Sequence, residues 1–286
     1  MTHFAGFDQY GSETPVLPVL ISVPHAGRRY PAPVAGLVRL GMAELLPLED
    51  RYADLLADTA IAHGVQALIA RVPRLWIDLN RDVREYDPAM LNGAIDPPPM
   101  MTAKVRGGLG LIPRKIARGG EIWRTKLGAE DVAERIASLH RPYHVRLDAM
   151  LKATHARFGV AVLIDIHSMP PLVDRTGEGA PQIVIGDRFG KSADGRFTAC
   201  ALALVEGRGI AASVNSPYAG GHILERHGAP GKGIHALQLE VDRRLYLDFT
   251  LAREGAGLRA MQLLICELIE VLCDEARRPS YAIAAE

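Results

Sequence analysis

Polar side chains that could do chemistry stand beside several apolar, strand-like runs of this sequence. The placements are His25 after residues 16–23, Asn80 and Arg81 after residues 75–79, His167 after residues 160–166, and Glu240 within residues 235–241. Ligands of open α/β sheets bind at the carboxyl ends of the strands, which lie along one edge of the sheet. We therefore expect these side chains to meet at that edge.

The histidines among them suit a metal ion. Two imidazoles and one carboxylate are a ligand set of catalytic zinc sites, which keep a further position open for water. His25 and His167 supply the imidazoles. Asp50 is the favoured carboxylate and Glu49 the alternative, because both precede a predicted helix that follows the His25 loop. The other interpretation of Asp50 is a negative charge at a helix N-terminus, stabilised by the helix dipole.

The remaining polar residues suit proton transfer and the binding of a carboxylate. A glutamate such as Glu240 can accept a proton from an attacking water and later return it. Arg81 beside Asn80 can grip a carboxylate through paired hydrogen bonds. Structural roles stay open for both charged residues, since Glu240 could pair with an arginine such as Arg243, and Arg81 could pair with Asp78.

Strands that alternate with helices must position these side chains. Predicted strands cover residues 16–23, 65–72, 75–79, 160–166, 182–185, 210–214 and 235–241. Predicted helices cover residues 45–64, 129–158, 197–208 and 248–276. A break is expected near His140 and Arg141, because Pro142 follows them. The alternation predicts an α/β fold with a mixed, mostly parallel central sheet flanked by helices on both faces.

Residues 86–123 differ in composition from the rest of the chain. They hold three consecutive prolines at 97–99 and glycine pairs at 107–108 and 119–120, with little periodic apolar content. We predict that this segment is a long excursion, or a lid over the site, within a single domain of residues 1–286.

Other histidines could also bind a metal. His222 and Glu225 form an H-x-x-E pattern that His227 follows, but they stand after a glycine pair in a predicted loop. His140 and His144 have the four-residue spacing of a helical ligand pair, with Pro142 between them. We favour the histidines at the strand ends over both of these groups.

Composition narrows the classes of partner. Lys+Arg 33 balances Asp+Glu 33, which disfavours a sequence-independent nucleic-acid binder. No apolar run is long enough to predict a membrane span, and the three cysteines lack a C-x-x-C pair, which favours a reducing compartment. We expect a cytoplasmic protein that binds neither nucleic acid nor membrane, and formation of a homo-oligomer stays open.

Seven runs stand in order along residues 18–248. They are ISVPHAG, LEDRYADLLAD, RLWIDLNR, RPYH, LIDIHSMP, NSPYAGG and ALQLEVDRRLYLD. Together they resemble the N-formylglutamate amidohydrolase family, and the resemblance implies a fold similar to those of zinc carboxypeptidases and aspartoacylases. That wider group carries H-x-x-E at its first metal motif, whereas Arg28 stands three residues after His25 here. The resemblance therefore moves the carboxylate ligand to the next helical segment, at Asp50.

The resemblance also implies residue roles around a single zinc ion. His25 and His167 match the two histidine ligands, and Glu240 matches the catalytic glutamate. Arg74 looks like the arginine that polarises the carbonyl of the bond to be cleaved.

Substrate-binding roles follow from the same comparison. Asn80 and Arg81 match the motif that binds the substrate carboxylate. His144, in the RPYH run, is a wall of the pocket or a hydrogen-bond donor behind it, with structural packing as the alternative. Arg106 or Arg114 could meet a second carboxylate, on the ground of charge alone.

The resemblance implies zinc-dependent hydrolysis of the amide bond of an N-formyl acidic amino acid, with N-formyl-L-glutamate giving formate and glutamate. One alternative keeps the site and changes the substrate to another N-acyl amino acid or a small peptide. The other alternative is a non-catalytic carboxylate-binding protein without a metal.

Overall fold

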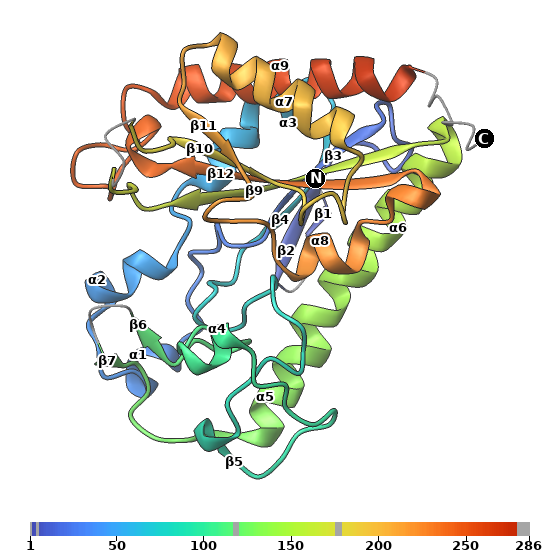
Figure 1. The fold of residues 1–286 in the computed structure, drawn as a ribbon. Coiled ribbons are helices and arrows are strands. Elements are labelled where there is room, and N and C mark those ends of the chain that lie inside the picture. The colour runs from blue at the N-terminus through green and yellow to red at the C-terminus, as the bar shows by residue number, and fades with distance from the viewer. Residues whose placement is uncertain (1, 4–5, 117–119, 175–178, 279–286) are drawn as a thin grey trace.

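The computed structural model describes residues 2–3, 6–116, 120–174 and 179–278, and its centre is an eight-stranded mixed sheet. In spatial order its strands are β1 (Thr2–His3), β2 (Phe7–Tyr10), β4 (Gln66–Ala70), β3 (Val19–Val23), β9 (Ala161–Met169), β12 (Ile234–Asp242), β10 (Ile183–Gly186) and β11 (Ala212–Val214) (Figure 1). Strands β4, β3, β9 and β12 are parallel to one another, and β10 runs antiparallel to β12. The predicted mixed, mostly parallel sheet is thus confirmed.

Helices cover both faces of this sheet. In chain order, the helices of the described residues are α1 (Val34–Leu37), α2 (Met42–Leu45), α3 (Asp58–Ala62), α4 (Ala103–Arg106), α5 (Ala129–Arg135), α6 (Arg141–Phe158), α7 (Gly195–Gly207), α8 (His222–His227) and α9 (Leu258–Arg277). Figure 1 shows α3, α7 and α9 on one face, and α6 and α8 on the other. None of the described helices is both long and apolar enough to cross a membrane.

Strand alternation divides the core between the two faces. In β9, Ile164 packs with Phe197 and Ile265 on the α9 face, whereas Leu163 packs with Tyr143 and other residues on the α6 face. Every residue of β9 is buried, as in a central strand covered on both sides. Further along β9, the side chains on the α6 face become polar, and this change marks the site.

The predicted strand at residues 75–79 is wrong. Pro73 begins a turn there, in which the Trp76 N–H donates to the Pro73 carbonyl, and the Asp78 N–H donates to Leu111 O. The segment is apolar because it is buried, not because it belongs to the sheet. Strands β1 and β2, which form one edge of the sheet, were not expected from the sequence.

The predicted helix at residues 45–64 is also interrupted. A 3₁₀ turn, η1 (Leu46–Leu48), is followed by an irregular stretch, a second turn, η2 (Ala53–Ala57), and then α3. Tyr52 has a left-handed backbone with φ 58°, which stops helical hydrogen bonding at that point. The closing helix begins at Leu258 rather than at residue 248. By contrast, the break before Pro142 is confirmed as a π-helical turn, Ile136–His140.

Residues 86–123 lie on the same side of the sheet as α6, next to α5 (Figure 1). They contain α4 and the short strands β5 (Leu91–Asn92), β6 (Lys115–Ile116) and β7 (Gly120–Glu121), and β5 pairs with β8 (Leu127–Gly128). Leu111, Ile122 and Trp123 join the core of the α6 face. Residues 117–119 lie outside the described part of the chain, and a role of the segment as a lid stays a prediction.

Candidate active site

A cavity of about 500 Å³ opens on the α6 face of the sheet, at the carboxyl ends of β9 and β12. This volume is within the range of small-molecule sites, about 300–1,000 Å³. Its lining includes Asp50, Arg74, Asn80, Arg81, His167 and Glu240 from the sequence-based set, together with Lys104, Leu109, Ser168, Tyr218, Gln238 and Arg243. The expected residues therefore converge, although the turn that carries Asn80 and Arg81 is not a strand.

His25, Asp50 and His167 form a buried group that could hold a metal ion, with ligand atoms within 4.8 Å of one another. Asp50 Oδ2 lies 3.0 Å from His167 Nδ1 and 3.5 Å from His25 Nδ1. The Nδ1 atom of His25 is buried without a hydrogen-bond partner among the described residues. A buried polar atom left unpaired is costly. The donor set therefore fits a cation that this nitrogen could bind.

A carboxylate lies within hydrogen-bond distance of the Nε2 atom of each imidazole. His25 Nε2 lies 2.7 Å from Asp78 Oδ1, and His167 Nε2 lies 2.9 Å from Asp165 Oδ2. Carboxylates in such positions fix the tautomer and orientation of metal-binding histidines. Burial alone would lower the pKa of His167, but the charge of Asp165 and its hydrogen bond, with that of Asp50, raise the pKa to about 10. The sequence signal for this pair was a carboxylate inside an apolar run, which needs a buried partner.

Asp50, rather than Glu49, points toward the histidines. Its backbone N–H donates to His25 O at 3.1 Å, which ties this loop to the turn after β3. Glu49 instead accepts hydrogen bonds from Tyr30 Oη at 2.6 Å and Arg51 Nη1 at 2.8 Å. The structure thus favours Asp50 among the two carboxylates that the sequence left open.

Glu240 faces the cavity beside His167, its partner in the register of β12 and β9. Gln238 Nε2 donates to Glu240 Oε1 at 3.0 Å. Burial raises the pKa of Glu240 to about 7; His167 opposes this shift, and the charge of Asp50 adds to it. A carboxyl group that titrates near neutral pH is suited to accept and return a proton.

The arginines of the cavity have defined partners. Arg74 Nε lies 3.1 Å from Asp78 Oδ2 and 3.2 Å from His25 Nε2. Arg81 donates from Nε to Leu109 O at 2.9 Å, while its Nε is 3.9 Å from Asp78 Oδ2. Asp78 therefore serves His25, Arg74 and Arg81 together.

Asn80 is clamped between the sheet and α8. Its Oδ1 accepts a hydrogen bond from the Ile223 N–H at 2.8 Å, and its Nδ2 lies 3.2 Å from His167 Nε2. Gly221 packs directly on the amide, where a Cβ would fall 2.5 Å from Asn80 Oδ1. The second glycine of the NSPYAGG run is therefore required by this contact.

His144 lies behind the cavity rather than in its wall. Its Nε2 donates to Leu79 O at 2.9 Å, and His140 Nε2 donates to Arg81 O at 2.8 Å. The two histidines therefore hold the backbone on either side of Asn80.

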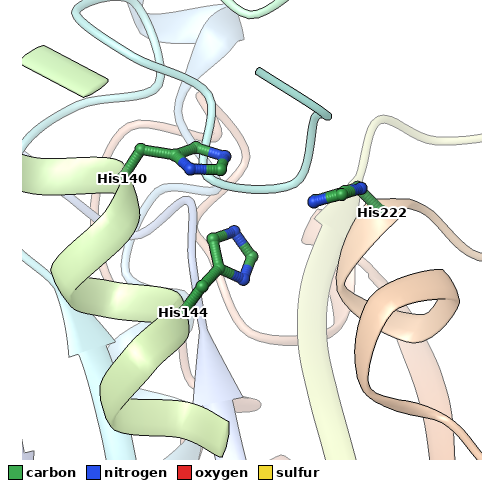
Figure 2. Close-up of side chains that lie close together, drawn as sticks. All are labelled: His140, His144 and His222. Carbon is green, nitrogen blue, oxygen red and sulfur yellow. The ribbon is translucent and has the colours of Figure 1, made fainter. Parts of the chain in front are cut away.

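His140 at the end of the π-helical turn, His144 in α6 and His222 in α8 converge (Figure 2) and offer ring nitrogens within 4.8 Å of one another. Residues 222–227 are the helix α8, not the predicted loop. Both ring nitrogens of His144 are already bonded, since its Nδ1 lies 3.0 Å from His227 Nε2. Burial lowers the pKa of His140 to about 4 and that of His227 to about 3, so both are neutral at pH 7. We interpret His140 and His144 as a neutral, hydrogen-bonded support for the Leu79–Arg81 turn, whereas His222 Nε2 is buried without a hydrogen-bond partner among the described residues.

Arg106 and Arg114 do not reach the cavity. Arg106 Nη1 donates to Met101 O at 2.6 Å, and Arg114 lies 3.2 Å from Asp87 and 2.6 Å from Glu121. The sequence-based choice of these two for a second carboxylate is therefore wrong. Lys104 and Tyr218 line the cavity instead, and no local sequence signal separated them from other surface residues.

Fold and site together define an α/β protein with the donor set of a metal-dependent hydrolase. The sequence profile described as N-formylglutamate amidohydrolase matches residues 17–247. N-formylglutamate deformylase of Pseudomonas aeruginosa is 32% identical over 90% of this chain and 92% of its own length, and that of Pseudomonas putida is 31% identical over 82% and 83%.

A crystal structure of N-formylglutamate amidohydrolase from Ralstonia eutropha superimposes with a TM-score of 0.85 at 28% identity, covering 96% of this chain and 98% of that one. A protein from Agrobacterium tumefaciens shares the fold, with a TM-score of 0.68 at 20% identity and 94% coverage of both chains. The chain belongs to the N-formylglutamate amidohydrolase family.

Proposed function

We propose that this protein hydrolyses N-formyl-L-glutamate to formate and glutamate, with one zinc ion bound by His25, Asp50 and His167. The names of the relatives at 31–32% identity support the substrate. The observation that carries the chemistry is the buried His25 Nδ1, which has no hydrogen-bond partner among the described residues and lies beside Asp50 and His167. Asp50 and His167 in turn line the cavity that Glu240 faces.

A zinc ion held by His25, Asp50 and His167 would act as a Lewis acid toward the formyl carbonyl and would lower the pKa of a bound water. Glu240 accepts a proton from the attacking water and returns it to the amine nitrogen as the C–N bond breaks. Water and the formamide are thereby converted into formate and a free amine, with no other reactant. A pKa of about 7 lets the same carboxyl group act in both directions.

Two arginines act on the substrate. Arg74, held by Asp78, donates a hydrogen bond to the carbonyl oxygen as negative charge grows on it. Arg81 binds the α-carboxylate, while the clamp on Asn80 keeps the preceding residue in place. Both guanidiniums lie at the cavity surface, where a substrate would replace water around them.

The test measures formate and amine release by purified protein from N-formyl-L-glutamate, N-acetyl-L-glutamate and a glutamate-containing dipeptide, with elemental analysis of the protein. We expect fastest release from the formyl substrate, loss of activity on chelation and recovery with zinc. Faster release from the acetyl substrate or the dipeptide would support the alternative substrates. Activity that persists in metal-free protein would reject zinc, and binding of glutamate without any turnover would support the non-catalytic alternative.

A further inference from the structure

Lys104 is a cation of the cavity that the described protein groups leave unmatched. Arg74 is paired with Asp78, and Arg243 donates to Ser168 Oγ at 3.1 Å and lies 3.5 Å from Asp50. No carboxylate among the described residues comes within ion-pair distance of Lys104, although it lines the same cavity. Unmatched positive charge in a concave site favours an anionic ligand.

Lys104 is coupled to Arg81 through the backbone. The Leu109 N–H donates to Lys104 O at 2.8 Å, and Leu109 O accepts the hydrogen bond from Arg81 Nε at 2.9 Å. Both cationic side chains also line a second, smaller cavity of about 250 Å³, which adjoins the first at these residues. Two cations therefore line the same two cavities, one from the Leu79–Arg81 turn and one from α4.

The helix that carries Lys104 is anchored to the fold. Thr102 caps α4 by accepting a hydrogen bond from the Val105 N–H at 3.3 Å, and its hydroxyl donates to Glu85 at 2.9 Å. Val105 is buried in the core, with 1% of its surface exposed. The backbone of Lys104, between these two anchors, is therefore held in place, and its exposed side chain lies at the rim of the cavity.

We propose, resting on the proposed function, that Lys104 is a specificity residue that binds the side-chain carboxylate of the substrate while Arg81 binds its α-carboxylate. The site would then select N-acyl amino acids with two carboxylates. Arg81 shares Asp78 with two other groups, and no carboxylate of the described residues is within ion-pair distance of Lys104, so two acidic groups of one ligand would pair with these two cations. Arg106 and Arg114 cannot take this role, because they are bonded elsewhere.

The electrostatics of Lys104 agree with this role. Removal of water around its ammonium group lowers the pKa of Lys104, and the charge of Arg81 lowers it further, whereas the more distant carboxylates of Asp78 and Glu85 oppose the shift. A bound carboxylate between the two cations would offset that repulsion.

The experiment compares N-formyl-L-glutamate with N-formyl-L-glutamine, which has nearly the same shape without the second charge. Lys104→Met in the zinc-loaded protein should lower kcat/KM for the glutamate substrate about 10- to 100-fold, mainly through KM, as expected for a lost charged hydrogen bond. The value of kcat/KM for the glutamine substrate should change less than about threefold. Lys104→Arg should restore part of the preference for the glutamate substrate over the glutamine substrate. Lys115→Met, on the exposed β6 of the same segment, is the matched control and should behave as wild type.

The role of Lys104 would be overturned if Lys104→Met lowered kcat/KM equally for both substrates, or did not lower it for the glutamate substrate. Calorimetric binding of N-acetyl-L-glutamate and N-acetyl-L-glutamine to the same variants separates this result from failure of the proposed function. If the wild type releases no formate yet prefers the dicarboxylate in binding, and Lys104→Met abolishes that preference, the specificity role stands and the reaction does not. If wild-type protein does not discriminate between the two ligands in either assay, Lys104 is not a specificity residue.

Discussion

Opposing interactions set the pKa of Glu240. Burial and the negative Asp50 favour its protonated form, whereas His167 and Arg74 favour the carboxylate, and the balance gives a pKa of about 7. No ion pair fixes the side chain, and Gln238 is its hydrogen-bond donor among the described residues. The structural alternative, a buried pair with Arg243, is not what the structure contains, because Arg243 donates to Ser168 and Glu49 O.

Glu240→Gln should keep the metal and lower kcat on N-formyl-L-glutamate about 10²- to 10⁴-fold, because the amide cannot accept the proton. Steady-state kinetics and elemental analysis of the same sample check this. Glu270→Gln, on the exposed side of α9, is the control and should change neither quantity. Turnover near the wild-type value would remove Glu240 from the reaction.

Arg81→Lys tests whether the guanidinium binds the α-carboxylate. Lysine keeps the charge but loses the fork that meets a carboxylate with two hydrogen bonds. Because Arg81 also donates to Leu109 O and Asn80 O, some loss is expected with every substrate. The measured quantity is therefore a ratio: kcat/KM should fall at least about tenfold more for N-formyl-L-glutamate than for its α-amide, N-formyl-L-isoglutamine. Parallel losses, with a lowered Tm, would make Arg81 purely structural.

The turn of residues 79–81 is held by two helices rather than by the sheet. His144 and His140 on the α6 side bind its carbonyls, and the first turn of α8 binds the Asn80 side chain. These three hydrogen bonds act on three consecutive residues. Helix packing thereby sets the positions of the substrate-binding groups at the edge of the cavity.

His144→Leu should raise KM for N-formyl-L-glutamate several-fold with the metal content unchanged. It should also cost about 1–3 kcal/mol of stability, because Leu79 O and His227 lose a buried partner. Kinetics, elemental analysis and urea unfolding measure the three effects, with His63→Leu, at an exposed position just after α3, as control. Loss of the metal in the His144 variant would show instead that this histidine supports the metal group.

The metal group joins segments that are far apart in the chain. His25 follows β3, Asp50 lies between η1 and η2, and His167 is in β9. A cation bound by all three connects them in the folded state alone, since the unfolded chain has no preformed site. The stability of the molecule should therefore depend on the metal.

Chelation should lower the Tm of the metal-loaded protein by about 5–10 °C, the shift expected when about 2.7 kcal/mol of binding energy is lost from a domain of this size. Scanning calorimetry before and after chelation, and after zinc is restored, measures the shift. His167→Ala is the control and should show no response to chelator. An unchanged Tm in wild-type protein whose metal has been removed would contradict the site.

The sequence by itself determined the features that depend on local pattern. Apolar runs located the central strands, and polar residues that interrupt them, such as His167 and Glu240, located the site. Pro142 predicted the irregular turn in the long helix because its ring cannot fit a regular one. The ordered set of motifs predicted the family because motifs are read along the chain, without knowledge of which segments touch.

Only the tertiary structure decided the features that depend on contact between distant segments. Residues 75–79 are apolar through burial in a turn, and Asp50 rather than Glu49 faces the histidines because its loop is bonded to His25. Lys104, not Arg106, reaches the cavity because α4 is packed against Arg81 through Leu109. Charge and apolarity are properties of a residue, whereas pairing and burial are properties of its neighbours, which the folded chain alone brings together.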